Sequence, residues 1–161
     1  MIDWISERRE ISAEEYVRHV TVLLDEASSW CTRRGLSVVR DVIDLNKEFP
    51  GKYEAPRLRI STDDEVLALV EPAWARPLRA NGLVKLRGPI STHRLLLYVD
   101  IGPERFRGRV IDGKVIRSAA RVFHQIKGNG FYWIEGDMHT PKIVDESQFI
   151  ALISDVCGYE F

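Results

Sequence analysis

Apolar residues lie three or four positions apart through the first part of the chain. They are Tyr16, Val17, Val20, Leu23, Leu24, Ala27 and Cys31. This spacing places them on one face of an α-helix. Ser12 with Glu15 three positions later is a capping-box pattern, and Gly35 stands where helices commonly end. We therefore predict an amphipathic helix between Ser12 and Gly35.

The next segment, LSVVRDVIDLNKEF, carries apolar residues at Val38, Val39, Val42 and Ile43. Their spacing fits a second helix, although β-branched side chains leave a strand as the alternative. Pro50 ends the segment in either case. On this pattern we expect residues 1–50 to be helical.

From Arg57 onward the pattern changes to short runs rich in β-branched and aromatic residues, as strands are. Three glycine-containing turn signals interrupt these runs, and each predicts a hairpin. They are Asn81-Gly82, Asp112-Gly113 and the segment KGNG at 127–130. Consecutive hairpins predict an antiparallel β meander of about five to seven strands over residues 57–135.

The last helical pattern begins at Asp145, which forms a capping box with Gln148, and Gly158 stands at its end. Its apolar stripe is Phe149, Ile150, Leu152, Ile153 and Val156. We predict a C-terminal helix over residues 145–157. The chain then reads as a single α+β domain, residues 1–161, in which N-terminal helices and a C-terminal helix cover one face of the sheet.

Charge is balanced overall, with 23 basic and 24 acidic side chains, but it is unevenly distributed. Residues 52–127 hold 15 basic and 8 acidic side chains, a difference of +7, whereas both ends of the chain are acidic. Two interpretations remain open. Either acidic helices neutralise a basic sheet, or the sheet exposes a cationic face to an acidic protein or a nucleic acid.

Several classes of protein lack support in the sequence. No apolar run of about 18 residues could span a bilayer, so we expect a cytoplasmic protein without a membrane partner. Cys31 and Cys157 stand alone on helical apolar faces and are expected to be free thiols. The motifs GxGxxG, GxxxxGK[ST], GxSxG, HExxH and CxxC are absent, and we predict no cofactor.

The segment YWIEGDMHT is the nearest approach to a chemical motif. On one continuous strand Glu135, Asp137 and His139 would point to the same side and could hold a divalent metal. Gly136-Asp137 before Pro141 is instead typical of a turn, which would break that alignment. We predict no metal site here and keep a metal-dependent hydrolase as the alternative.

Arg105, Arg107 and Arg109 recur at every second position, so on one strand they would form a cationic row. Such a row is stable when it is solvated, paired with acidic groups or bound to an anionic partner. We predict it as the partner-binding site. His93 and Ser91 lack a third residue for a nucleophilic triad at the sequence level.

These observations predict a non-catalytic module that binds another macromolecule. The partner expected is a protein with an acidic surface, as for small inhibitor, immunity or accessory subunits. A nucleic-acid-binding domain that uses the basic strands is a further alternative, because single-strand binders combine cations with exposed aromatic rings.

Overall fold

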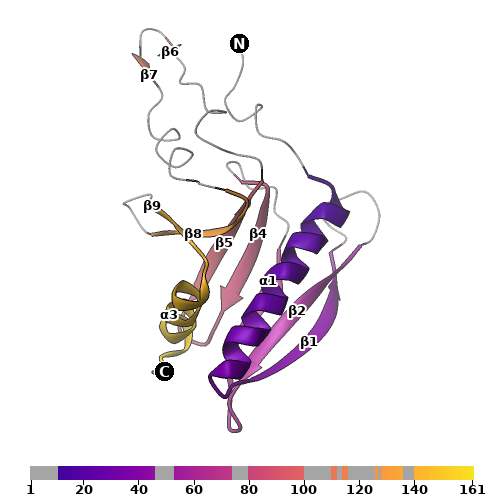
Figure 1. Ribbon diagram of the computed structural model, residues 1–161, viewed down its shortest axis with the longest axis vertical. Helices are drawn as coiled ribbons and strands as arrows, with labels where there is room; N and C mark the ends of the chain where they lie inside the picture. The colour runs from indigo at the N-terminus through magenta and orange to yellow at the C-terminus, as the bar shows by residue number, and fades with distance from the viewer. Residues whose placement is uncertain are drawn as a thin grey trace.

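The computed structural model describes residues 11–45, 53–73, 80–99, 110–111, 114–115, 126, 128–135 and 140–161. Within these ranges the chain forms an N-terminal helix, a seven-stranded antiparallel sheet and a C-terminal helix (Figure 1). This arrangement confirms the predicted α+β class and the predicted antiparallel meander. No helix in the described residues is both long and apolar enough to cross a membrane.

Helix α1 (Ala13–Arg33) follows the sequence prediction closely. The Ser12 side chain caps the helix by accepting a hydrogen bond from the Glu15 amide at 3.1 Å. Gly35 follows the end of the helix with a φ of 79°. The apolar stripe is buried against the sheet and includes Tyr16, Val20, Leu24, Ala27 and Cys31. Local capping and periodicity therefore determine this element.

The segment after α1 is a strand, so the prediction that residues 1–50 are helical is wrong there. Strand β1 (Ser37–Asp44) pairs along its whole length with β2 (Glu54–Ser61), from Ser37 opposite Ser61 to Asp44 opposite Glu54. The β-branched residues of this segment favour the extended form once a partner strand is present. Only one N-terminal helix stands in the described residues, where several were expected.

The remaining strands continue the meander. They are β3 (Val66–Pro72), β4 (Gly82–Arg87), β5 (Thr92–Tyr98), β8 (Gly130–Glu135) and β9 (Thr140–Ile143). The strand order is β1-β2-β3-β4-β5-β8-β9, so the sheet extends beyond the predicted limits of 57–135 at both ends. Strands β6 (Val110–Ile111) and β7 (Lys114–Val115) pair separately on either side of residues 112–113, as the hairpin signal there predicts.

The hairpin predicted around Asn81-Gly82 forms, since β3 pairs antiparallel with β4, but Gly82 is not in its turn. Gly82 is the first residue of β4 and lies opposite Leu97. A Cβ atom at Gly82 would stand 2.7 Å from the Tyr16 ring, so the glycine allows α1 to approach the sheet. The Asn81 side chain accepts a hydrogen bond from the Val99 amide at 2.8 Å and extends the pairing of β4 with β5. Asn81 and Gly82 are thus explained by contacts with residues distant in the sequence, although the pair has the composition of a tight turn.

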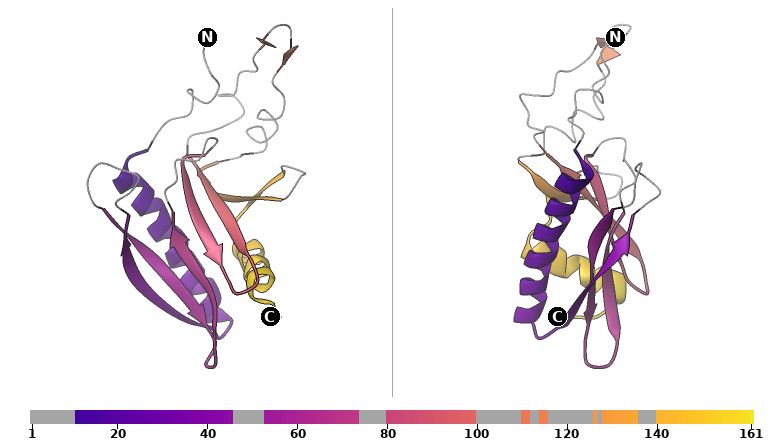
Figure 2. Two further views of the ribbon diagram at one scale, coloured as in Figure 1. Left: turned by 180° about the vertical axis from the view of Figure 1, so that it is seen from behind. Right: turned by 90° about the vertical axis from the view of Figure 1, so that its right-hand side faces the viewer.

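Helix α3 (Glu146–Cys157) begins at Asp145, whose side chain accepts a hydrogen bond from the Gln148 amide, and ends at Gly158 in the left-handed conformation. It covers β3, β4 and β5, whereas α1 covers β1 and β2. Trp30 of α1 meets Phe149 of α3 at 5.5 Å between ring centroids. Both helices therefore lie on one face of the sheet, and no described helix covers the opposite face (Figure 2).

The two edges of the sheet differ in length and composition. Strand β1 forms one edge with eight residues that are mostly exposed on both faces. Strand β9 forms the other edge with four residues, one of which is Pro141. A short strand with a proline is a poor template for further pairing, whereas a long regular edge is a good one.

Candidate binding surface on the open face of the sheet

The sheet face opposite α1 and α3, called the open face below, carries most of the charge on strands β1 to β5. Side chains directly opposite each other in an antiparallel sheet point to the same face. The register places Arg57 between Asp41 and Glu71, and Lys85 between Glu71 and Arg94. The basic patch on this face consists of Arg57, Arg59, Lys85, Arg87 and Arg94. Two carboxylates lie on the same face, Asp41 on β1 and Glu71 on β3.

Two of the five cations are neutralised within the sheet. Arg57 donates two hydrogen bonds to the Asp41 carboxylate, at 2.9 and 2.5 Å, and these bonds hold the pKa of Asp41 below its usual value. Arg87 donates to Glu71 at 2.7 Å, and an Arg57 nitrogen lies 3.9 Å from the same carboxylate. These partly exposed pairs fix the positions of the charges more than they stabilise the fold.

The other three cations, Arg59, Lys85 and Arg94, have no ion pair or side-chain hydrogen bond in the described part of the chain. Arg59 and Arg94 are exposed, and Lys85 is half-buried between strands. Adjacent strands are about 4.8 Å apart, so Lys85 and its cross-strand neighbour Arg94 repel one another. The open face therefore gathers three cations that form no ion pair within the described residues, although the charge of Arg59 acts on nearby Asp41.

Within the described residues, the charge distribution bears on the interpretation that acidic helices neutralise a basic sheet. The helices are acidic, with Asp25 and Glu26 on α1 and Glu146 and Asp155 on α3, but they cover the face opposite the basic patch. Their ion pairs reach Arg40, Arg33 and His93 instead. No ion pair in the described residues joins either helix to Arg57, Arg59, Lys85, Arg87 or Arg94 of the basic patch.

Apolar side chains lie among the cations. Val39 is 56% exposed and stands opposite Arg59, which has half-buried Leu69 on its other side. Beyond Arg94, half-buried Leu96 continues the same face of β5. Protein interfaces combine exposed apolar side chains with arginine in this way.

The two aromatic rings described on the open face are not available for stacking. Tyr98 and Tyr132 meet edge to face at 5.8 Å between centroids and are buried in a small cluster with Ala80 and Ile126. Single-stranded nucleic acids bind mainly on exposed aromatic faces beside cations. The described part of this surface supplies the cations without the rings.

The predicted binding row at Arg105, Arg107 and Arg109 lies outside the described residues, which resume with β6 at Val110. The sequence reasoning missed Arg57, Arg59, Lys85, Arg87 and Arg94. The signal was present, because RLR and KLR show the same alternation that singled out the later arginines. The residues of the basic patch became a candidate site only once the covered face of the sheet was known.

The alternative metal site stays a prediction, because the structure describes only one of its three residues, Glu135. Glu135 ends β8 and stands opposite Thr140, the first residue of β9. Asp137 and His139 themselves lie outside the described residues.

His93 has a carboxylate partner that the sequence did not reveal. Its Nε2 atom contacts the Asp155 carboxylate of α3, and the Trp133 ring stands edge-on to it at 5.5 Å. The Ser91 hydroxyl donates to the Asp155 backbone carbonyl at 3.5 Å, and no Ser91–His93 hydrogen bond forms. The His93–Asp155 pair joins α3 to β5. Ser91, His93 and Asp155 do not form a nucleophilic triad.

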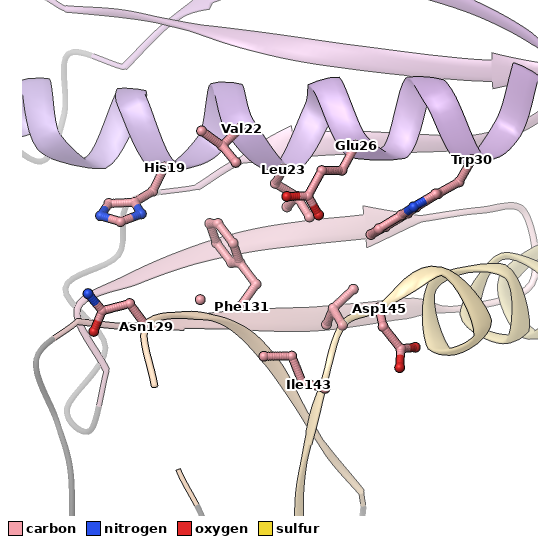
Figure 3. A pocket seen from close by; sticks show the side chains of 11 residues that line it. His19, Val22, Leu23, Glu26, Trp30, Asn129, Phe131, Ile143 and Asp145 are labelled. Carbon is pink, nitrogen blue, oxygen red and sulfur yellow. The ribbon is translucent and has the colours of Figure 1, made fainter. Parts of the chain in front are cut away.

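A groove with a volume of about 350 Å³ lies on the helix side, between α1 and the start of β8 (Figure 3). Phe131 stands in its centre and faces Val22, Leu23 and Trp30 of α1. Its polar side chains are His19, Glu26, Asn129 and Asp145. The groove is apolar inside and lacks the convergent polar groups that usually fix a small ligand.

No family model, curated protein or solved structure matches the chain. The geometry of its own residues is therefore the basis for a functional proposal.

Proposed function

We propose that the protein is a non-catalytic binding module that docks an acidic protein surface on the open face of its sheet. The observation that carries this proposal is the set of three cations, Arg59, Lys85 and Arg94, that have no ion pair within the described chain. Small inhibitor, immunity and accessory subunits are the class of protein that this surface fits. Carboxylates of the partner would pair with these cations and relieve their mutual repulsion.

A protein partner fits this surface better than a nucleic acid does. Asp41 and Glu71 lie within the basic patch and would repel phosphates, whereas a protein partner can offer donors to them. The buried rings of Tyr98 and Tyr132 remove the stacking contribution. Free thiols at Cys31 and Cys157 are consistent with the reducing cytoplasm as the compartment.

The proposal is tested by affinity capture from an extract of the native host, followed by titration of the purified partner. The variant Arg59→Glu/Arg94→Glu should lose the partner, with an affinity at least about tenfold weaker, and wild-type binding should weaken as salt rises. Both side chains are exposed, so the melting temperature should change little.

The matched control is Arg18→Glu/Arg34→Glu, which changes charge equally at exposed positions in and just after α1. It should retain the partner. Equal capture by both double variants would contradict the proposal. A parallel titration with a short fluorescent single-stranded DNA tests the alternative, which tight binding abolished by Arg94→Glu would support.

A further inference from the structure

The outer edge of β1 presents a regular row of backbone hydrogen-bonding groups. In an antiparallel pair, alternate residues direct both N–H and C=O toward the neighbouring strand. Leu45 donates to the Tyr53 carbonyl at 2.8 Å, so the odd-numbered residues face β2. Pro56, which has no N–H, stands opposite Val42 at a position that needs none. The outward-facing residues are Val38, Arg40, Val42 and Asp44.

This edge lacks the usual obstacles to pairing with another strand. The pairing of β1 with β2 is regular over eight residues without a bulge, and β1 contains no proline. Val39 and Val42 are 56% and 57% exposed and point to opposite faces of the sheet. No strand in the described ranges pairs with the outer side of β1.

The charges on β1 select one self-complementary register. A two-fold axis between the antiparallel edge strands of two copies runs perpendicular to the sheet. It sets even-numbered residues opposite even-numbered residues and odd-numbered opposite odd-numbered ones. An axis at Arg40 would place two arginines opposite each other, and an axis at Asp41 would oppose two carboxylates. An axis at Val42 joins two exposed valines and sets Arg40 of each copy opposite Asp44 of the other.

We propose that two copies of the chain associate through β1 in this Val42-centred register to form one continuous antiparallel sheet. The pair of Val42 residues and both Arg40–Asp44 pairs exchange both backbone hydrogen bonds, because all three residues direct their groups outward. In the described part of the chain Asp44 has no ion pair, and Arg40 forms an ion pair with Asp25 alone, at 2.9 Å. This inference does not depend on the partner proposed for the open face.

Pairing through β1 would keep corresponding faces together. Because the axis is perpendicular to the sheet, both α1 helices would lie on one side and both basic patches on the other. The dimer would therefore present a basic surface of twice the width to a partner.

Sedimentation equilibrium across a range of protein concentrations tests the proposal. The wild type should dimerise, and Asp44→Lys or Arg40→Glu should each weaken the dimer by about tenfold, since each replaces two attractive pairs by repulsive ones. The double variant Arg40→Glu/Asp44→Lys should restore dimerisation, because opposite charges face each other again. Asp63→Lys, at an exposed turn position between β2 and β3, is the matched control and should change nothing.

Cysteine cross-linking identifies the register. In a Cys157→Ser background, Val42→Cys should give an intermolecular disulfide under mild oxidation, since directly opposed Cα atoms about 5.5 Å apart suit that bond. Arg40→Cys and Asp41→Cys should cross-link far less. A protein that stays monomeric at every concentration, or a dimer that neither charge variant weakens, would overturn the proposal.

Discussion

Tyr16 connects α1 with two strands through a single hydroxyl group. The hydroxyl donates to the Leu83 carbonyl at 2.6 Å and accepts from the Ala73 amide at 3.0 Å. Burial raises the pKa of Tyr16 well above its usual value, so the group remains a neutral donor. The ring lies against Gly82, where a larger residue would push it away. One side chain thereby sets the height of the helix above the sheet.

Replacing Tyr16 with phenylalanine should lower the free energy of unfolding by about 1–3 kcal/mol, because the Ala73 amide and the Leu83 carbonyl would lose a buried partner. Urea denaturation measures the change. Tyr159→Phe, at a residue 40% exposed near the C-terminus, is the control and should have almost no effect. Equal midpoints for the Tyr16 variant and the wild type would show that the two backbone groups find other partners.

A single ion pair between β1 and β2 makes stability depend on pH. Hydrogen bonds from Arg57 lower the pKa of Asp41 in the folded state. Its stabilising contribution is therefore present above the usual aspartate pKa of about 3.9, and it is lost as the pH falls through the lower folded value.

Asp41→Asn should accordingly be less stable than the wild type at neutral pH, and the difference should disappear at an acidic pH below the lowered folded pKa of Asp41, where the wild-type carboxylate is protonated too. Thermal denaturation at both pH values measures it. Asp63→Asn, at an exposed turn residue, should show no difference at either pH. A gap of the same size at both pH values would mean that the Asp41 charge is not responsible.

At the scale of elements, the helices are held by buried apolar stripes. Leu24 of α1 and Ile153 of α3 are fully buried in one core with the inner side chains of β2 to β5. The turn between β4 and β5 also anchors α3, because the Ile90 amide donates a hydrogen bond to the Val156 carbonyl at 2.8 Å. Both helices are thus structural covers of the sheet.

Leu24→Ala and Ile153→Ala should each cost about 2–5 kcal/mol of stability, as truncations in tightly packed cores do. Val22→Ala, on the exposed side of α1, should change it by less than about 0.5 kcal/mol. Chemical denaturation followed by circular dichroism compares the three variants. Unchanged midpoints for Leu24→Ala would contradict the assigned core.

At the scale of the whole molecule, the sequence could predict what local signals encode. Ser12 and Asp145 begin their helices by hydrogen bonds three residues away, so their patterns were sufficient. The segment Ser37–Asp44 could not be assigned locally, because its apolar spacing fits a helix as well as a strand and the β2 partner decides. Gly82 was misread because its reason, the Tyr16 ring, is distant in sequence.

The basic composition of the candidate site was predictable from the sequence, but the face of the sheet on which it lies was not. The excess of basic residues over 52–127 and their alternation in RLR and KLR were visible in the sequence. Which strand face they occupy follows only from the side on which α1 and α3 pack, and this depends on contacts between distant segments. Asp155 as the partner of His93 is likewise a contact across 62 positions.

The unequal edges of the sheet bear on how the protein behaves at high concentration. Strand addition that can continue at both edges of a sheet leads to fibres, whereas addition at one edge stops after the first step. Here β9 has four residues and Pro141, which cannot donate a backbone hydrogen bond, so further growth from that edge is disfavoured. The proposed association through β1 would use the longer edge of the seven-stranded sheet in each copy, so strand addition would end at the dimer instead of continuing into an amyloid-like aggregate.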